Sequence, residues 1–338
     1  MARICIVPTV EGIGGTASFR RKFEAGLLRR GIEISHNAGE PADAVLVIGG
    51  TKNLLSLWKA HRGGVRIVQR LDGINWIHRR RRTGLRHFLR AEYGNFILSL
   101  IRSRIATHIL YQSEFSQRWW ESWYGKSRAG CSVVHNGIDL TEYRPPDSPR
   151  SAGGRCRLLV VEGSLGGGYD MGLDNAVRLA ETLAGKHGFP VELMVVGRIT
   201  DEHRQMVEAH AHVPIIWAGL LPPEQIPETD RSADILFSAD LHPACPNSVI
   251  EALACGVPVV AFDTGAVKEL VTGDAGRVVP YGGDPWKLDQ PDILRLAEAA
   301  TGILRDRPRF SAGARALALR QLGLDKMMDG YLKALLEE

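Results

Sequence analysis

The chain has 338 residues, of which 24% are charged and 44% hydrophobic, with 37 glycines, 17 prolines and 5 cysteines. This length suits two domains with a core each, and the composition excludes a disordered, collagen-like or disulfide-rich protein. The sequence contains no apolar run near the roughly 20 residues that span a bilayer, which excludes an integral membrane protein.

The formal net charge of +4 is unevenly distributed along the chain. Residues 1–150 contain 24 Lys and Arg against 12 Asp and Glu, whereas the remaining residues contain 18 against 26. Such a basic half indicates an anionic partner: nucleic acid, an anionic membrane surface or a phosphorylated acceptor. The cysteines are scattered, which favours reduced thiols in the cytoplasm and predicts no metal site. The apolar run close to the N-terminus leaves no room for a signal peptide, which also favours the cytoplasm.

The first half alternates apolar runs with helical patterns. Ile4–Val7 predicts a strand leading into a Gly-rich turn, and a helix is predicted from about Ser18 to Arg30, where Gly31 ends it. Between Gly84 and Ala106, apolar residues recur three, four or seven positions apart, which predicts one long amphipathic helix. Further strands are predicted at 44–50, 66–71, 107–111 and 131–134.

Residues 145–154 are rich in Pro, Gly and Ser, which predicts an interdomain linker between domains 1–147 and 155–338. The alternation then restarts, and a last helix is expected from about Arg315 to Leu336, packed on either domain. The pattern predicts the α/β class, with two Rossmann-like, doubly wound parallel sheets that bind ligands at the carboxyl ends of their strands. The second set of strands is predicted at 158–161, 191–196, 215–219, 235–238 and 257–262, with a helix at 174–185.

The segment from Leu241 to Val260 carries the clearest chemical signal. Ser248 stands three residues before Glu251, at the start of an apolar helical run that ends at Gly256. A helix N-terminus offers free amides and partial positive charge to a phosphate, and Glu251 would accept two ribose hydroxyls. The same spacing also fits a capping box, in which Glu251 only bonds the backbone at Ser248.

This segment resembles the donor-site signature of retaining glycosyltransferases of the GT-B fold, the large family often numbered four (glycosyl transferases group 1). The resemblance extends over nearly the whole chain, through Gly14-Gly15, residues 111–116, residues 135–139 and the Gly-rich turn and strand at 265–271. It implies two domains facing a cleft, with a nucleotide sugar on the C-terminal domain and an acceptor on the N-terminal one. It also implies no divalent metal and no cofactor besides the nucleotide-sugar co-substrate.

The resemblance also implies roles for individual residues. Glu251 would hold the donor ribose, and Asn247 and Ser248 would face the sugar or diphosphate. The loops after Val196 and around Leu220 would flank the base. The implied donor-binding residues are Gly14, Gly15, Gly163, Ser164, Gly197, Arg198, Leu220, Pro246, Asn247, Ser248, Val249 and Glu251, and the catalytic candidates are Asp72, Arg198 and Lys268.

The chain departs from the family pattern at three places. The first acid of the donor signature is replaced by Pro243, and the nearest upstream carboxylate, Asp240, is out of register by three positions. The two cations expected on the diphosphate are missing, because their places read Gly163-Ser164 and Met171-Gly172. The histidine expected after an early strand is replaced within Arg70-Leu-Asp-Gly73.

Other residues could compensate for these losses. Arg198 or Lys268 would then take over the diphosphate charge, although each is also explained as a solvated surface cation. Asp72 would orient an acceptor hydroxyl, although an Asp-Gly turn needs no function.

The run Arg79–Arg82 with Trp76 resembles a basic interfacial element that rests on anionic lipid, with Trp76 at headgroup level; a solvated loop is the alternative. Nucleic acid is disfavoured because the arginines lack interleaved aromatics. The tryptophans at 119, 120 and 123 are expected to be packing residues.

The hypothesis that follows is a cytoplasmic retaining glycosyltransferase, peripheral on the membrane, that acts on a glycan or lipid-linked acceptor. The alternative is a catalytically weak or inactive GT-B protein that binds nucleotide or glycan in a regulatory role. An epimerase or phosphorylase of the same fold and a dinucleotide-dependent enzyme are less favoured, because neither a pyridoxal-bearing lysine nor a full Gly-x-Gly-x-x-Gly pattern is found.

Overall fold

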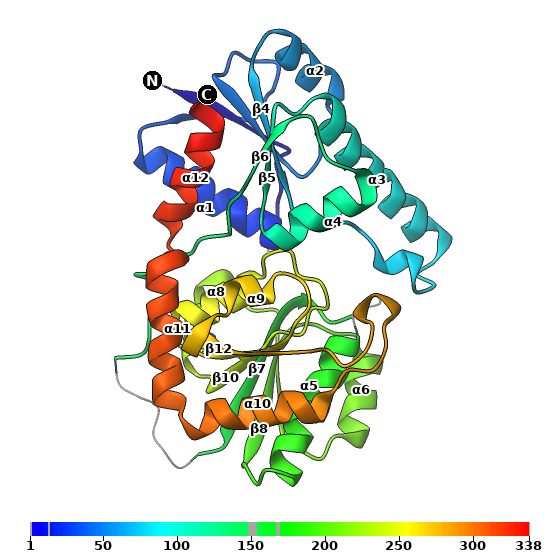
Figure 1. Cartoon of the computed structure of the whole chain (residues 1–338), viewed down its shortest axis with the longest axis vertical. Coiled ribbons are helices and arrows are strands. Elements are labelled where there is room, and N and C mark those ends of the chain that lie inside the picture. The colour runs from blue at the N-terminus through cyan, green and yellow to red at the C-terminus, as the bar shows by residue number, and fades with distance from the viewer. Residues whose placement is uncertain (1, 13, 148–153, 167–169, 338) are drawn as a thin grey trace. The chain divides into compact units, whose positions relative to one another are not determined.

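The protein is described by a computed structural model that covers residues 2–12, 14–147, 154–166 and 170–337 (Figure 1). The chain forms two compact units: unit 1 comprises Met1–Gly137 and Leu324–Glu338, and unit 2 comprises Ile138–Gly323. The domain boundary predicted at 147 is therefore too late. Residues 138–147 belong to unit 2, where Ile138 bridges to Gly323 and Tyr143 is buried in the core. Most of the predicted linker, residues 148–153, lies outside the described residues.

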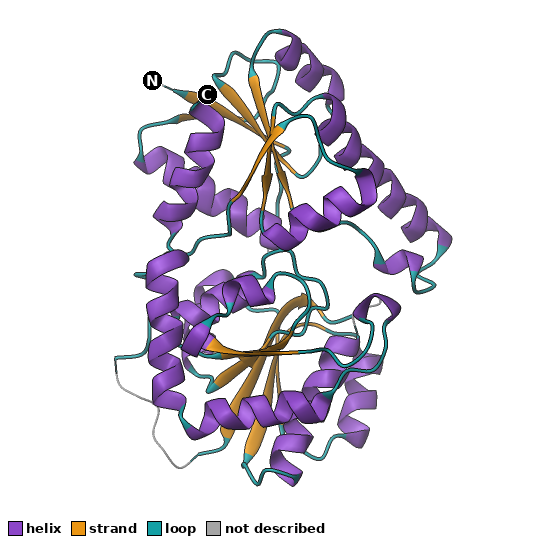
Figure 2. Cartoon of the chain, viewed as in Figure 1, coloured by secondary structure: helices purple, strands orange, loops and turns teal. Residues whose placement is uncertain are grey.

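Unit 1 is a six-stranded parallel sheet in the order β2-β1-β3-β4-β5-β6, with helices on both faces (Figure 2). Helices α1 and α12 pack on one face, and α2 and α3 pack on the other. The strands are β1 Arg3–Val7, β2 Glu33–Ser35, β3 Ala44–Ile48, β4 Arg66–Leu71, β5 His108–Tyr111 and β6 Gly130–Val133. The helices are α1 Gly15–Arg29, α2 Leu54–Arg62, η1 Ile77–Arg79, α3 Leu85–Arg104, α4 Glu114–Tyr124 and α12 Leu324–Leu336.

Unit 2 is also a six-stranded parallel sheet, in the order β12-β11-β10-β7-β8-β9. The two sheets confirm the predicted fold class. The strands are β7 Cys156–Ser164, β8 Val191–Arg198, β9 Ile215–Gly219, β10 Ile235–Phe237, β11 Val259–Phe262 and β12 Gly276–Val279. The helices are α5 Met171–Gly185, α6 Asp201–His210, η2 Pro223–Gln225, α7 Ile226–Arg231, α8 Asn247–Ala254, α9 Val267–Leu270, η3 Gly273–Ala275, η4 Pro285–Lys287, α10 Ile293–Arg305 and α11 Arg307–Gln321.

The strand order of unit 2 reverses between β7 and β10. From β7 the chain builds outward through β8 and β9, and then returns to the other side of β7 with β10, β11 and β12. In open parallel sheets, ligands bind outside the carboxyl ends of the strands at such a reversal. The residues after β7 and β10 are therefore the first place to look for a site.

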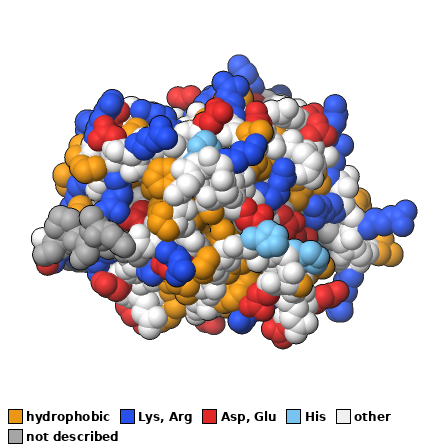
Figure 3. Space-filling view, turned by 90° about the horizontal axis from the view of Figure 1, so that it is seen from below, with side chains coloured by type: hydrophobic (Ala, Val, Ile, Leu, Met, Phe, Trp, Pro, Cys, Tyr) orange, Lys and Arg blue, Asp and Glu red, His pale blue; other side chains and the backbone are white. Residues whose placement is uncertain are grey.

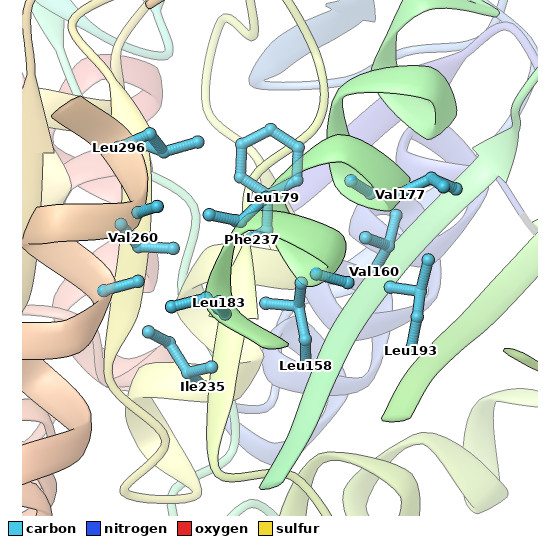
Figure 4. Packing of buried hydrophobic residues seen from close by; sticks show 14 of the residues in the cluster. Leu158, Val160, Val177, Leu179, Leu183, Leu193, Ile235, Phe237, Val260 and Leu296 are labelled. Atoms are coloured by element: carbon cyan, nitrogen blue, oxygen red, sulfur yellow. The ribbon is translucent and has the colours of Figure 1, made fainter. Parts of the chain in front are cut away.

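A continuous apolar core holds this strand order in place (Figure 4). Leu158, Leu193, Ile235 and Val260 come from the four strands β7, β8, β10 and β11, and all are buried. They pack with the leucines of α5 and with Leu296 of α10. Removal of this apolar surface from water fixes the strand ends that carry the site.

The predicted last helix is in fact two helices. It breaks at Leu322 and Gly323, between α11 and α12. Helix α11 buries Phe310, Leu317 and other apolar residues in unit 2, whereas α12 lies beside α1 in unit 1, as the red and blue helices of Figure 1 show. The two halves of the predicted helix therefore bury their apolar sides in two different cores.

The surface carries charges of both signs. Basic and acidic side chains are interspersed over the face that Figure 3 shows. Among the described residues, no helix combines the length and apolar character needed to cross a membrane.

Candidate functional site

A cavity of about 230 Å³ lies at the reversal point of the unit 2 sheet. Its walls come from the end of β7, the start of α5 and the residues that follow β10. This is the position at which ligands bind in doubly wound sheets. The lining residues are Glu162, Ser164, Leu165, Met171, Gly172, Ala239, Asp240 and Leu241.

Two carboxyl groups share this cavity, Glu162 and Asp240. Burial, with a contribution from the negative charge of Asp240, raises the pKa of Glu162 to about 8. Burial also raises the pKa of Asp240, although backbone N–H groups that donate to it, among them that of His242 at 3.3 Å, act in the opposite direction. Ionising both carboxyl groups in one partly dehydrated cavity costs free energy, because the two negative charges repel each other. The pair therefore holds a proton near neutral pH.

Glu162 is a site residue that the sequence interpretation missed. A signal was present, because each of two apolar runs, 158–161 and 235–237, is followed within three residues by an acid. Only the pairing of β7 with β10 brings those two acids together. Asp240, out of register with the family signature, thus lies in the cavity wall while the in-register residue Pro243 does not.

Helix α8 begins at Asn247, and its N-cap residue is Pro246, which contributes no side-chain hydrogen bond. Ser248 is therefore the second residue of the helix, and this register excludes the capping-box alternative, which needs Ser248 at the N-cap. The amides of the first turn have no intrahelical acceptor. Pro246, Asn247, Ser248 and Glu251 are partly exposed, whereas Val249 is fully buried in the core.

Asp230 of α7 lies close enough to Glu251 to sense its charge. The side chain is fully buried, and neither carboxyl oxygen has a hydrogen-bond partner among the residues that the structure describes. Burial raises the pKa of Asp230 well above its ordinary range, with a smaller contribution from the charge of Glu251. Burial and the charge of Glu251 thus both favour the protonated form of Asp230.

The loops after β8 and β9, which are predicted to flank the base, follow strands that pair with each other. Gly197 has a φ of +144°, and a Cβ there would overlap the carbonyl oxygen of Glu162, so only glycine fits. Arg198 pairs with Ser164 in the sheet, and its carbonyl accepts from the Leu165 N–H at 2.8 Å. Its exposed side chain makes no ion pair with any residue that the structure describes.

Leu220 directly follows β9 and is exposed. A Gly-rich turn was expected at 163–168, but Gly163 and Ser164 form the exposed end of β7, and residues 167–169 lie outside the described part of the chain.

The turn at Gly265 closes the loop that follows β10. Gly265 has a φ of +59°, a Cβ there would overlap Pro243, and the Ala266 N–H donates to the Pro243 carbonyl at 2.8 Å. Pro243 thus makes a packing contact where the family signature has an acid. His242 stacks on Trp286 with ring centroids 3.6 Å apart, and burial lowers its pKa to about 4, so the ring is neutral.

The structure differs from two expectations about the segment that follows Gly265. The strand predicted after Gly265 is instead the single-turn helix α9. Lys268 lies on that helix and forms an exposed ion pair with Asp263 at 3.1 Å, which favours its interpretation as a surface cation.

The predicted site residues of unit 1 lie at strand ends. Gly14 is the N-cap of α1 and Gly15 its first residue. Asp72 follows β4, and its carbonyl accepts from the Ser116 hydroxyl at 2.7 Å and from the Trp120 indole N–H at 2.8 Å. Burial raises the pKa of the Asp72 carboxyl, although the positive charge of Arg70 opposes this shift.

Three tryptophans of unit 1 are buried, whereas Trp123 is half-buried and Trp58 is exposed. Trp119 and Trp120 of α4 are buried, as predicted. Trp76 is also buried, so the prediction that it lies at lipid headgroup level is wrong. It packs inside the unit rather than pointing outward from the basic run.

The sequence of this chain is similar to known glycosyltransferases. Residues 157–306 match the sequence model of a family described as "Glycosyl transferases group 1". The D-inositol 3-phosphate glycosyltransferase of Xylanimonas cellulosilytica is 31% identical over 232 residues, which cover 62% of this chain and 53% of that protein. The chain spans about half the length of the curated relatives that it matches.

Two solved structures are similar over nearly the whole chain. Sucrose-phosphate synthase from Thermosynechococcus elongatus has a TM-score of 0.74 at 13% identity, covering 98% of this chain and 97% of that one. The Anabaena protein HepE, solved in complex with UDP-glucose, has a TM-score of 0.70 at 14% identity, with 99% of each chain covered. At such identities the likeness identifies the fold, GT-B.

Proposed function

From the match of residues 157–306 to group 1 glycosyltransferases, together with the GT-B fold of the whole chain, we propose that this protein transfers a sugar from a nucleoside diphosphate to an acceptor. One observation carries the proposal: the cavity at the reversal point of the unit 2 sheet is lined by the residues after β10, which lead directly into α8. A cavity at the carboxyl ends of parallel strands, lined by a loop that continues to the start of a helix, suits a phosphorylated ligand.

The donor would be held by unit 2. In this proposal Glu251 accepts the ribose hydroxyls, and the first amides of α8, with Asn247 and Ser248, face the diphosphate or the sugar. Leu220 and the backbone at Gly197 flank the base. Arg198 supplies the positive charge that faces the diphosphate. Its exposed side chain forms no ion pair with any described residue, which supports this role. The HepE complex makes uridine diphosphate sugars the first donors to test.

Transfer would proceed with retention of configuration. The bond from the anomeric carbon to the diphosphate oxygen breaks, and the acceptor oxygen bonds to the same face of that carbon. The acceptor hydroxyl gives its proton to the departing diphosphate oxygen, and no protein nucleophile takes part. Amides and Arg198 would stabilise the leaving charge without a divalent metal. An unchanged rate in the presence of a chelator, and an α-linked product from an α-linked donor, are the expected results.

The acceptor would be an anionic or lipid-linked glycan bound by unit 1. The excess of basic residues in the first 150 residues supports an anionic acceptor and a location in the cytoplasm at the membrane surface. The name of the Xylanimonas relative, which includes a phosphorylated acceptor, agrees with this charge. Asp72, whose pKa is raised by burial, would orient the acceptor hydroxyl.

The test begins with binding. Uridine, guanosine and adenosine diphosphates are compared by their melting-temperature shifts, followed by donor hydrolysis and transfer with sugars of the best nucleotide. Glu251→Ala should weaken nucleotide binding at least tenfold, because it removes a charged acceptor of two hydrogen bonds. Glu202→Ala, an exposed carboxylate on α6, is the matched control. Equal affinity of the Glu251 variant and the wild type would refute the site.

The alternative, a GT-B protein that binds nucleotide without turnover, is favoured by one observation. Glu162 and Asp240 line the cavity in which a leaving diphosphate would need positive charge. Nucleotide binding by calorimetry, with no hydrolysis or transfer from any donor in the panel, would support this alternative over the enzyme.

A further inference from the structure

Helix α3 presents an apolar stripe to solvent. The helix packs on the sheet of unit 1 through Ile97 and Ile101, which are buried. Leu85, Leu89, Tyr93 and Phe96 are 75%, 59%, 55% and 59% exposed. Their spacing of four, four and three places them on one side of the helix. The helix was predicted correctly, but these four side chains face solvent and not the core.

Basic side chains border this stripe. Arg82, Arg86 and Arg90 are exposed, and none of them forms an ion pair with an acidic residue in the described part of the chain. The seven residues Leu85, Leu89, Tyr93, Phe96, Arg82, Arg86 and Arg90 are here called the α3 face. Contiguous exposed apolar surface of this kind marks an interaction site in water-soluble folds.

Hydrogen bonds hold the segment before α3 against the helix. Glu92 accepts hydrogen bonds from the Arg79 Nε and from His78 Nε2, each at 2.6 Å, and from Arg79 at a second nitrogen at 2.8 Å. The Arg79 guanidinium lowers the pKa of Glu92 to about 2. These bonds tie η1 to α3 and neutralise the acidic side chain nearest the stripe. One arginine of the predicted basic run, Arg79, is thereby a structural residue rather than a lipid contact.

From this placement we propose that the α3 face docks the protein on an anionic lipid bilayer. A helix with leucine and aromatic side chains on one side and arginines at its border lies in the plane of the membrane interface, with its apolar side among the acyl chains and its cations at the phosphates. Nucleic acid offers phosphates but no apolar layer for the two leucines. The inference is independent of sugar transfer, since it concerns only unit 1 and lipid.

The experiment is co-sedimentation of the full chain with vesicles of phosphatidylcholine alone, or of phosphatidylcholine and phosphatidylglycerol in equimolar amounts. The wild type should pellet with the second kind and remain in the supernatant with the first. Leu89→Glu should lower the partition coefficient at least tenfold, because it removes apolar surface and adds a repelled charge. The double variant Arg86→Gln, Arg90→Gln should lower it by roughly thirtyfold, from two lost cation contacts.

The matched control is Leu319→Glu on α11, where the leucine is 57% exposed, as against 59% for Leu89. This variant should bind vesicles like the wild type, and circular dichroism checks that all variants are folded. Equal binding to both kinds of vesicle, or an equal loss in Leu319→Glu, would overturn the proposal. A dimer in lipid-free solution that Leu89→Glu dissociates would identify a second copy as the occupant and would also overturn it.

Discussion

Arg198 is the residue that we propose to stabilise the charge of the leaving diphosphate. The family pattern lost both of its diphosphate cations here, at Ser164 and Met171, and both of these positions line the unit 2 cavity. Arg198 pairs with Ser164 along β7 and β8, so it lies beside one of the two lost positions. Lys268, the other candidate, is already paired with Asp263.

Replacement of Arg198 by alanine should therefore slow sugar transfer or donor hydrolysis by about a hundredfold, since one donor to a developing negative charge is worth about 3 kcal/mol. Initial rates at saturating donor provide the measurement. Lys186→Ala, an exposed cation after α5, should leave the rate unchanged. A rate for the Arg198 variant within a factor of two of the wild type would show that the leaving charge is stabilised elsewhere.

The proton shared by Glu162 and Asp240 makes stability depend on pH. Because the pKa of Glu162 is raised in the folded protein, the folded chain holds a proton that the unfolded chain has released, and the contribution of this carboxyl to the free energy of unfolding falls as pH rises from about 5 to 8. Glu162→Gln is neutral at every pH and escapes this loss. Its melting temperature relative to the wild type should increase steadily over that interval.

Thermal melts at half-unit steps of pH measure the effect. Glu202→Gln, which changes an exposed carboxylate on α6, should show a constant difference from the wild type over the same interval. A constant difference for Glu162→Gln as well would mean that the cavity carboxyls are solvated and ordinary.

At the scale of elements, the turn between β11 and α9 holds the loop that leads to α8. Gly265 adopts a left-handed φ and lies directly against Pro243. The loop that leads to α8 is thus held by a contact between two residues that carry no charge. This explains why a proline is acceptable at the place of the family acid: it performs packing rather than sugar binding.

Gly265→Ala should destabilise unit 2 by at least about 1–2 kcal/mol, from the left-handed conformation alone, and by more through overlap with Pro243. Differential scanning calorimetry should show a fall of several degrees. Gly302→Ala is the opposite control: it lies exposed within α10 with free space around it, so alanine should add about 0.5–1 kcal/mol of stability. A neutral Gly265 variant would show that the turn can relax.

At the scale of the whole molecule, the last helix completes the first unit. Tyr331 of α12 is fully buried against Phe19 and Phe23 of α1, and its hydroxyl accepts from the buried Arg70 Nε at 3.0 Å. Arg70 also donates to Asn136 at 3.0 Å. Residues at the two ends of the chain therefore share one core.

Tyr331→Phe removes the acceptor of a buried, charged donor and should cost about 1.5–3 kcal/mol. Urea unfolding followed by tryptophan fluorescence should detect the lower midpoint, because most tryptophans lie in unit 1. Tyr93→Phe removes an exposed hydroxyl and should leave the midpoint in place. Equal midpoints for all three proteins would mean that Arg70 finds another partner in the folded state.

The sequence by itself determined the features that depend on neighbours along the chain. Apolar runs predicted the strands, although β2 and β12 were missed, and the interval from Ser248 to Gly256 predicted a helix that the structure begins at Asn247 and ends at Ala254. Alternation of strands and helices was sufficient for the fold class, because parallel strands need helical crossovers.

Only the tertiary structure decided which distant residues meet. The pairing of β7 with β10 brings Glu162 to Asp240, and the burial of Trp76 and the exposure of Phe96 depend on how each segment packs against the sheet. The last helix divides because its two halves bury their apolar sides in different cores. Periodicity shows that a helix has an apolar side, but only packing determines whether that side faces the core or the solvent.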